Sequence, residues 1–163
     1  GAGDTGMGAG SRVRGERMTI RPIGRDDFMQ FAALYRRGLA ETEGVEVTDE
    51  YMVRWGVSIF PHLDEEDWLF LGAFDDAGEI RGFGMCYPLP CVDSVKRFIV
   101  GLWYIVPEAR GLRLAKGMLE YGLRWGKERG YQEFVANEGP MLNWLRKGFL
   151  GLKKWRTLYT GEV

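Results

Sequence analysis

The sequence contains one histidine, His62, and two cysteines, Cys86 and Cys91. These three side chains cannot complete a four-ligand Cys/His zinc site, and we expect no metal. A Ser-His-Asp triad would depend on His62, which follows Pro61 and is better explained as a surface residue. The cysteines are too few and too close in sequence for a disulfide framework, which indicates reduced thiols.

The sequence also has neither an excess of charge of one sign nor a long apolar run. The formal net charge is −1, so the molecule has no overall field that would attract nucleic acid. No run of about 18 apolar residues predicts a membrane span, and the first residues lack the apolar core of a secretory signal. We therefore expect a cytoplasmic protein without a membrane partner, and nucleic acid is not expected as a ligand.

Glycine is abundant at the start, where residues 1–17 read GAGDTGMGAGSRVRGER. Gly1, Gly3 and Gly6 formally satisfy G-x-G-x-x-G, but a dinucleotide-binding turn requires a strand before it, and none precedes residue 1 in this sequence. We interpret residues 1–17 as a flexible arm, a linker or an expression remnant. A length of 163 residues suits one domain, expected over 18–163.

The first half of this domain shows two helix patterns and a hairpin. A strand is predicted over 18–23, followed by a helix over 28–39 with Asp26 or Asp27 as its N-cap. Residues 41–47 read as an acidic loop. Further elements are a helix from the N-cap Thr48 to Phe60, stopped by Pro61, and a hairpin of strands 68–74 and 80–87 around the turn DDAGE.

The second half begins with a long strand over 95–106, in which Gly101 indicates a bend or a close backbone approach. A helix over 112–129, ended by Gly130, is the best-defined element. A strand over 131–137, a short helix over 140–147 and one or two strands after residue 148 follow. This order predicts an α/β fold in which helices cover both faces of a mixed sheet.

Between the long strand and the long helix the chain reads VPEARGLRLAKGML. A helix N-terminus has unpaired backbone N–H groups and the positive end of the helix dipole, so this turn is suited to hold a phosphate. A bound polyanion would compensate the charges of Arg110 and Arg113. The alternative is an ordinary helix start with two solvated arginines.

The element order, the strand end YIVPEARG, the turn into the long helix, the strand FVAN and the later RKGF resemble the GNAT superfamily of acetyltransferases. The resemblance covers residues 18–160. It implies a mostly antiparallel sheet of six to seven strands, with the fourth and fifth strands splayed apart. It also implies acetyl-CoA as the cofactor and an amine, on a small molecule or a peptide, as the acetyl acceptor.

In this family, a turn with the pattern Gln/Arg, two variable residues, Gly, one variable residue and Gly/Ala holds the pyrophosphate of coenzyme A. The matching positions are Arg110, Gly111, Leu112, Arg113, Leu114 and Ala115. Arg113 stands where the family has glycine, so its side chain must swing clear or act as a phosphate clamp. The resemblance also assigns the backbone of Tyr104, Ile105 and Val106 to the acyl carbonyl and pantetheine, and Asn137 to the cofactor.

Catalytic residues are harder to assign. The family's proton-donating tyrosine falls on Trp144, whose indole N–H can donate a hydrogen bond but is no general acid near neutral pH. The strand over 96–106 has no carboxylate, which leaves Glu133, Glu138 and Glu108 or the acidic loops as weak candidates for a general base. Trp144 serves equally well as a packing residue between helix and sheet.

Acidic side chains mark the expected acceptor region. They are Glu41, Glu43, Glu46, Asp64, Glu65, Glu66 and Asp67, and they suit a cationic amine or simply form a solvated face. The leading hypothesis is an acetyl-CoA-dependent N-acetyltransferase with direct transfer to an amine. The alternative is a catalytically silent binding or structural module of the same fold, for example in a phage particle. A homodimer or a larger assembly is compatible with either function.

Overall fold

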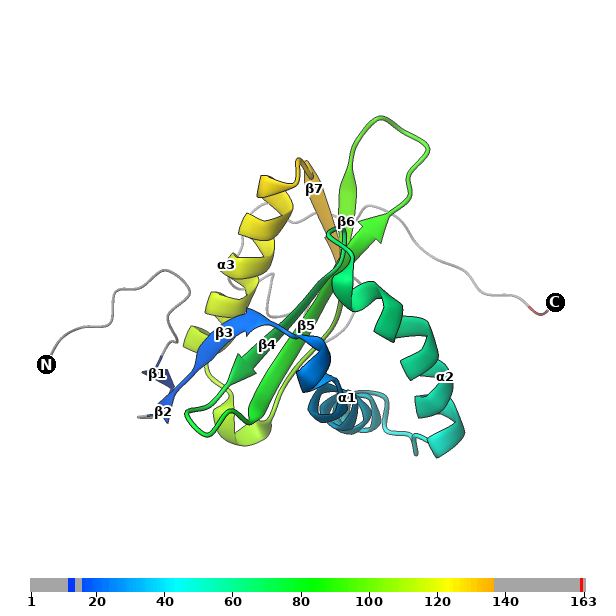
Figure 1. The fold of residues 1–163 in the computed structure, drawn as a ribbon. Helices are drawn as coiled ribbons and strands as arrows, with labels where there is room; N and C mark the ends of the chain where they lie inside the picture. Colours follow the sequence, from blue (N-terminus) through cyan, green and yellow to red (C-terminus); the bar gives the residue numbers. More distant parts are fainter. Residues whose placement is uncertain (1–11, 14–15, 137–161, 163) are drawn as a thin grey trace, which may run out of the picture.

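A computed structural model describes residues 12–13, 16–136 and 162 of the chain (Figure 1). The first described elements are the short strands β1 (Arg12–Val13) and β2 (Glu16–Arg17), which pair antiparallel. The segment expected to be a flexible arm thus contains a two-stranded ladder next to the domain. Asn137, Glu138 and Trp144 lie outside the described residues.

The central sheet has five strands in the described part of the chain, in the spatial order β3-β4-β5-β6-β7. They are β3 (Thr19–Pro22), β4 (Leu69–Phe74), β5 (Ile80–Leu89), β6 (Arg97–Ile105) and β7 (Glu133–Ala136). The first three pairings are antiparallel, and β6 pairs parallel to β7. The expected mixed, mostly antiparallel sheet is confirmed, while the strands expected after residue 148 lie outside the described residues.

Helices cover both faces of the sheet, as expected: α1 (Phe28–Glu43) and α2 (Asp49–Ile59) lie on one face and α3 (Leu112–Glu128) on the other (Figure 1). The predicted loop over 41–47 was wrong at its start, because residues 41–43 form the last turn of α1. Glutamates extend a helix readily, and α1 ends only at Gly44, whose φ of 66° is left-handed.

The sequence predicted the N-caps of these helices only in part. Thr48 caps α2 as predicted, since its hydroxyl accepts a hydrogen bond from the amide of Tyr51 at 3.1 Å. Asp27 occupies the N-cap position of α1 but does not cap it. Its carboxylate instead accepts from the amide of Gly24 at 2.9 Å and from Nη1 of Arg21 at 2.8 Å.

Two short 3-10 helices flank these elements. The first, η1 (Arg25–Asp27), leads into α1. The second, η2 (Phe60–Asp64), follows α2 directly. Pro61 therefore ends the α-helix, as predicted, but not the helical path, because proline is tolerated in the first turn of a helix.

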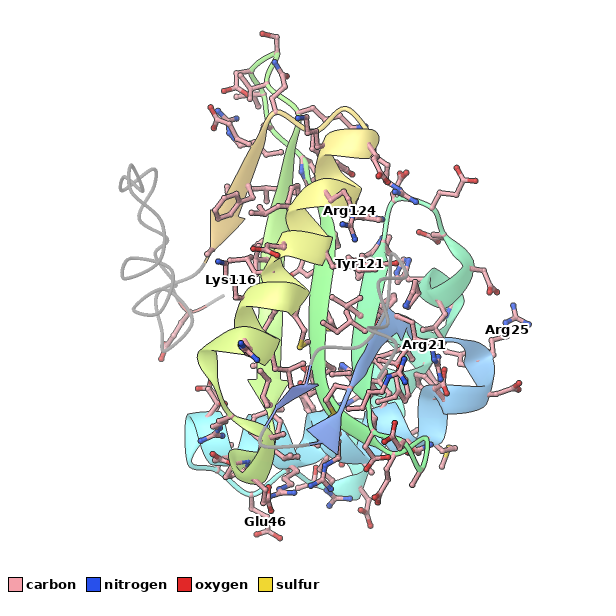
Figure 2. All side chains as sticks on the ribbon, turned by 90° about the vertical axis from the view of Figure 1, so that its left-hand side faces the viewer. Arg21, Arg25, Glu46, Lys116, Tyr121 and Arg124 are labelled. Carbon is pink, nitrogen blue, oxygen red and sulfur yellow. The ribbon has the colours of Figure 1, made fainter. Side chains whose placement is uncertain are left out.

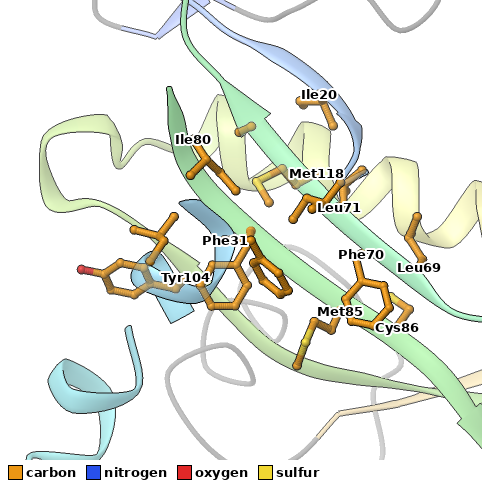
Figure 3. Close-up of a cluster of buried hydrophobic side chains, with 14 of the residues drawn as sticks. Ile20, Phe31, Leu69, Phe70, Leu71, Ile80, Met85, Cys86, Tyr104 and Met118 are labelled. Atoms are coloured by element: carbon orange, nitrogen blue, oxygen red, sulfur yellow. The ribbon is translucent and has the colours of Figure 1, made fainter. Parts of the chain in front are cut away.

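Apolar side chains fill the space between each helical layer and the sheet (Figure 3). On one face, Phe31 of α1 is fully buried and its ring lies 5.2 Å from that of Phe83 and 5.9 Å from that of Phe70, centroid to centroid. On the other face, Met118 of α3 and Leu71 of β4 are fully buried. Each such side chain stabilises the fold by about 1.5–3 kcal/mol.

Small residues bring α3 close to the sheet. A Cβ on Gly126 would lie 2.4 Å from the ring of Phe98, and one on Gly122 would lie 3.5 Å from Sγ of Cys86. The helix ends at Gly130, which has a φ of 77° and serves as the predicted C-terminal glycine. The position of α3 on the sheet therefore depends on the absence of side chains at these points.

Candidate functional site

The N-terminus of α3 lies directly after β6, across the single turn of 3-10 helix η3 (Pro107–Ala109). Gly111 is the N-cap of α3, and no side chain of the described residues caps this end. The first helical bond runs from the amide of Ala115 to the carbonyl of Gly111 at 3.3 Å. The amides of residues 112–114 therefore have no intrahelical acceptor and suit an anion.

Gly111 itself is extended, with a φ of 179°, so its conformation is open to any residue. As a glycine, it adds no side chain directly before the amides of residues 112–114. A ligand can approach the backbone there more closely than it could past a larger residue.

Arg113, on the first turn of α3, is exposed and has no ion pair or hydrogen bond to the described residues. Its guanidinium is thus free to contact an anion at the helix N-terminus. The clamp role remains a prediction, because the described contacts of Arg113 neither require nor exclude it.

Arg110 differs from Arg113, because the protein already holds its guanidinium. Nε of Arg110 donates to the carbonyl of Ile105 at 2.9 Å, and Nη2 donates to Oε1 of Glu41 at 2.6 Å. Arg110 is therefore not simply a solvated side chain, and its role in cofactor binding stays a prediction. Arg110 connects the turn to β6 and to α1, whereas Arg113 has no charged partner among the described residues.

Glu41 accepts hydrogen bonds through both carboxylate oxygens. Besides Arg110, the hydroxyl of Tyr104 on β6 donates to Oε2 at 2.5 Å. These bonds from Tyr104 and Arg110 lower the pKa of Glu41, while burial and the bond to Glu41 raise the pKa of Tyr104. Glu41 is therefore anionic and Tyr104 neutral at physiological pH.

Sequence reasoning placed Glu41 in an acceptor-binding loop and missed this contact. The signal was the continuation of helix-forming residues to Gly44, which places Glu41 one turn after Gly38 on the same helix face. Gly38 packs on the ring of Tyr104, so a longer helix prediction would have brought Glu41 to the tyrosine hydroxyl.

The backbone of β6 has one extra residue opposite β5. Gly84 pairs with Trp103 and Cys86 with Val100, so three steps on β6 match two on β5. The bulge lies at Gly101 and Leu102, where the sequence predicted a bend or close approach. A Cβ on Gly101 would lie 2.9 Å from the ring of Tyr87, which explains the need for glycine there.

Past the bulge, the backbone donors alternate between the two edges of β6. The amide of Val106 donates to the carbonyl of Arg81 at 2.9 Å, on the β5 side. The amide of Ile105 must therefore point to the opposite edge. Of the three expected positions 104–106, Ile105 is the one whose amide is directed away from β5.

The pairing between β6 and β7 runs from Arg97 opposite Glu133 to Val100 opposite Ala136. Residues 101–105 of β6 lie beyond this ladder. The expected divergence of the two strands concerns residues from 137 onward and stays a prediction.

The two candidate general bases within the described residues, Glu133 and Glu108, lie in different parts of the site region. Glu133 lies at the start of β7, where it accepts from Nε of Arg97 at 2.9 Å, at the end of β6 remote from Val106. Glu108 lies within η3, 3.8 Å from Nη2 of Arg37. Glu133 therefore forms an ion pair with Arg97, while Glu108 is adjacent to the turn.

The two flanks of α3 differ in character (Figure 2). Lys116 projects on the side of β7, whereas Tyr121 and Arg124 project on the side of β4. On that second flank lies a hollow of about 450 Å³, lined by Tyr121, Arg124, Trp68 and neighbouring residues. None of the expected cofactor residues between 104 and 115 lines it.

The described part of the chain has neither a membrane-spanning helix nor a cluster of metal-ligating side chains. None of its helices combines the length and apolar character needed to cross a membrane. Among the same residues, no three His, Cys, Asp or Glu side chains come together as a metal site would require. Cys86 and Cys91 are both free thiols, as expected.

Comparison with known proteins gives a family for this chain. Residues 30–149 match the model of the acetyltransferase (GNAT) family. No curated protein sequence matches the chain. The family match spans the site just described, from α1 through the turn before α3.

Solved structures share the fold at low sequence identity. A predicted acetyltransferase from Clostridium acetobutylicum, solved with acetyl-CoA, has a TM-score of 0.72 and 17% identity over 87% of this chain and 96% of its own. A ribosomal-protein-alanine N-acetyltransferase from Brucella melitensis has a TM-score of 0.66 and 21% identity over 90% and 99%. The aminoglycoside 6′-N-acetyltransferase AAC(6′)-Ih from Acinetobacter baumannii has a TM-score of 0.68 and 14% identity over 90% and 98%.

Proposed function

Because the chain belongs to the acetyltransferase (GNAT) family, we propose that it is an acetyl-CoA-dependent N-acetyltransferase that transfers the acetyl group directly to an amine. The observation that carries the proposal is the uncapped N-terminus of α3, placed directly after β6. This end presents free amides and the positive end of the helix dipole to a phosphate.

The described residues fit coenzyme A in three respects. The amides of residues 112–114 suit its pyrophosphate, and the free guanidinium of Arg113 adds a charged donor beside them. The amide of Ile105, directed to the edge of β6 away from β5, suits a carbonyl of the pantetheine arm or of the acetyl group. Coenzyme A would supply the activated acetyl thioester, and these residues would bind and orient it.

An outward amide at β6 also supports acyl transfer. A fixed N–H group directed at a carbonyl oxygen stabilises the negative charge that develops there during attack by an amine. This contribution requires no particular side chain. It therefore suits a site whose described strand β6 contains no carboxylate.

The acceptor in this proposal is an amine of a small molecule or a peptide. Neighbours of the same fold are named for a ribosomal protein and for aminoglycosides, which are both amine acceptors. The exposed acidic side chains of Glu43, the last residue of α1, and Glu46, in the loop after it, would attract such a cation.

Calorimetric titration of the purified chain with acetyl-CoA tests the cofactor. Micromolar binding, lost on competition with coenzyme A, is the expected result. Release of free thiol on addition of a panel of primary amines, aminoglycosides and basic peptides then tests transfer. Absence of binding would overturn the proposal.

Arg113, at the family's glycine position, favours a second candidate function. If its side chain blocks the amides, the chain would be a catalytically silent module of the same fold, used for binding or for structure. Coenzyme binding without turnover on any amine would support a binding module. Replacement of Arg113 by glycine that creates binding where the wild type has none would show that Arg113 is the block.

A further inference from the structure

We propose that Glu41 is a positioning residue for the coenzyme turn: it holds Arg110 against β6, which fixes the turn so that the first amides of α3 face the coenzyme. This inference rests on the proposed function. It concerns a residue of α1, a helix that contributes none of the expected cofactor-binding residues.

One hydrogen bond of the Arg110 side chain closes the turn on itself. Arg110 lies two residues before Leu112, where α3 begins, and its Nε donates to the carbonyl of Ile105 at 2.9 Å. The backbone from residue 105 to 110 is thereby tied into a ring. This ring contains η3 and leads directly to the N-cap Gly111.

Glu41 decides where the guanidinium of Arg110 lies. An arginine side chain has many rotamers, and a single bond to a carbonyl does not fix its plane. The second bond, from Nη2 to Oε1 of Glu41 at 2.6 Å, fixes the guanidinium between α1 and β6. Without that carboxylate, the positive dipole of α3 would repel the arginine from the turn.

Tyr104 in turn fixes Glu41. Its hydroxyl donates to the second carboxylate oxygen at 2.5 Å. The ring of Tyr104 cannot move toward α1, because Gly38 is already packed on it so closely that a Cβ there would lie 2.8 Å from Cγ. Each residue therefore fixes the next one: Gly38 fixes Tyr104, Tyr104 fixes Glu41, and Glu41 fixes Arg110, which holds the turn.

The exposure of the pair shows why positioning, and not stability, is its main effect. The side chains of Arg110 and Glu41 are 49% and 41% exposed, and ion pairs this open to water add little to the free energy of unfolding. A turn that is already ordered, however, loses less conformational freedom when a ligand binds. Loss of Glu41 should therefore weaken binding while the melting temperature changes little.

The competing explanation makes the opposite prediction. If Glu41 acts only through its negative charge near a phosphate site, its removal would strengthen the binding of coenzyme A. Glu41→Gln separates the two explanations, because glutamine has the same size and keeps an oxygen for Tyr104 but cannot pair with Arg110 as an anion. Positioning predicts about tenfold weaker binding, in line with one lost charged hydrogen bond.

A double-mutant cycle gives the decisive measurement. Dissociation constants for coenzyme A are measured by calorimetry for the wild type, Glu41→Gln, Arg110→Gln and the double variant. If Glu41 acts through Arg110, the double variant binds no more weakly than Arg110→Gln alone. Additive losses would overturn the inference.

Further readouts separate this role from general damage. Asp49→Asn is the matched control, since it removes the partner of Arg36 at 2.6 Å in another exposed pair of α1, and it should leave the affinity unchanged. In turnover assays, Glu41→Gln should raise KM for acetyl-CoA and leave kcat unchanged. If the wild type binds coenzyme A and Glu41→Gln binds it with the same affinity, this inference alone is refuted. If the wild type does not bind coenzyme A, the proposed function is refuted as well.

Discussion

Gly38 of α1 lies directly on the ring of Tyr104 of β6, with no room for a methyl group between them. A Cβ at residue 38 would lie 2.8 Å from Cγ and 3.1 Å from Cδ1 of the tyrosine. This contact sets the distance between helix and sheet at the end of α1. It thereby places Glu41, one turn later, within reach of the tyrosine hydroxyl.

Gly38→Ala should therefore destabilise the protein, although alanine is the better helix former. The clash with ring atoms costs about 1–3 kcal/mol, against a gain of about 1 kcal/mol in helix propensity. We expect a net loss of up to about 2 kcal/mol in the free energy of unfolding, measured in urea. Gly56→Ala is the matched control in α2, where the nearest atom would lie 3.8 Å from the new Cβ, and it should be neutral or stabilising.

Arg113→Ala should weaken acetyl-CoA binding about ten- to hundredfold if the guanidinium contacts a phosphate. Arg113→Gly removes the same charge but opens the backbone, so tighter binding by this variant would identify Arg113 as an obstacle. Titrations at low and high salt provide the check. A clamp loses part of its salt sensitivity on mutation, whereas an obstacle does not.

Asp27 should make the stability depend on pH in the acid range. The hydrogen bonds from Arg21, followed by that from the amide of Gly24, lower the pKa of Asp27 from its ordinary value of 3.8. A carboxyl with a lowered pKa in the folded state stabilises the fold fully above its ordinary pKa, and this contribution disappears as the pH falls through the lower, folded value. Asp27→Asn should thus be less stable than wild type at pH 7.

The difference between the two proteins should shrink as the pH falls below about 4, which urea midpoints at several pH values will show. Asp75→Asn offers a comparison, because Asp75 has amide partners in a turn but no arginine. A gap between wild type and Asp27→Asn that stays constant down to pH 2 would contradict the assigned role of the Arg21 pair.

The two cysteines should react very differently with thiol reagents. Burial raises the pKa of Cys86 to about 12, and the thiolate is the reactive form. Cys91 is only partly buried in the segment after β5. Ellman's reagent should therefore label one thiol in the native protein and two after denaturation. Cys91→Ser should abolish the labelling of the native protein.

Much of the fold could be predicted because the chain marks its elements locally. Thr48, Gly130 and the turn between β4 and β5 carried signals within a few residues, and each prediction was confirmed. The failures have a common physical cause. Asp27 was taken for a cap, but its partner Arg21 lies on β3, and a pattern within one helix cannot show a contact to another element.

The candidate site shows the same limit more clearly. The turn before α3 and the helix that begins after it were predicted from their own residues. The partner of Arg110 could not be predicted, because Glu41 lies 69 residues earlier and reaches the turn only through the packing of Gly38 on Tyr104. The spacing of residues in the sequence indicates where a helix begins. Which side chains surround that helix start depends on how the helices pack on the sheet.

The parallel pairing of β6 with β7 has a consequence for the order of folding. The hairpin of β4 and β5 forms from neighbouring segments, whereas Arg97 and Glu133 meet across 36 residues that include all of α3. Closing such a long connection is slow compared with forming a hairpin. The turn that precedes α3 belongs to this connection, so we expect the N-terminal end of the helix to reach its final position later than the hairpin of β4 and β5.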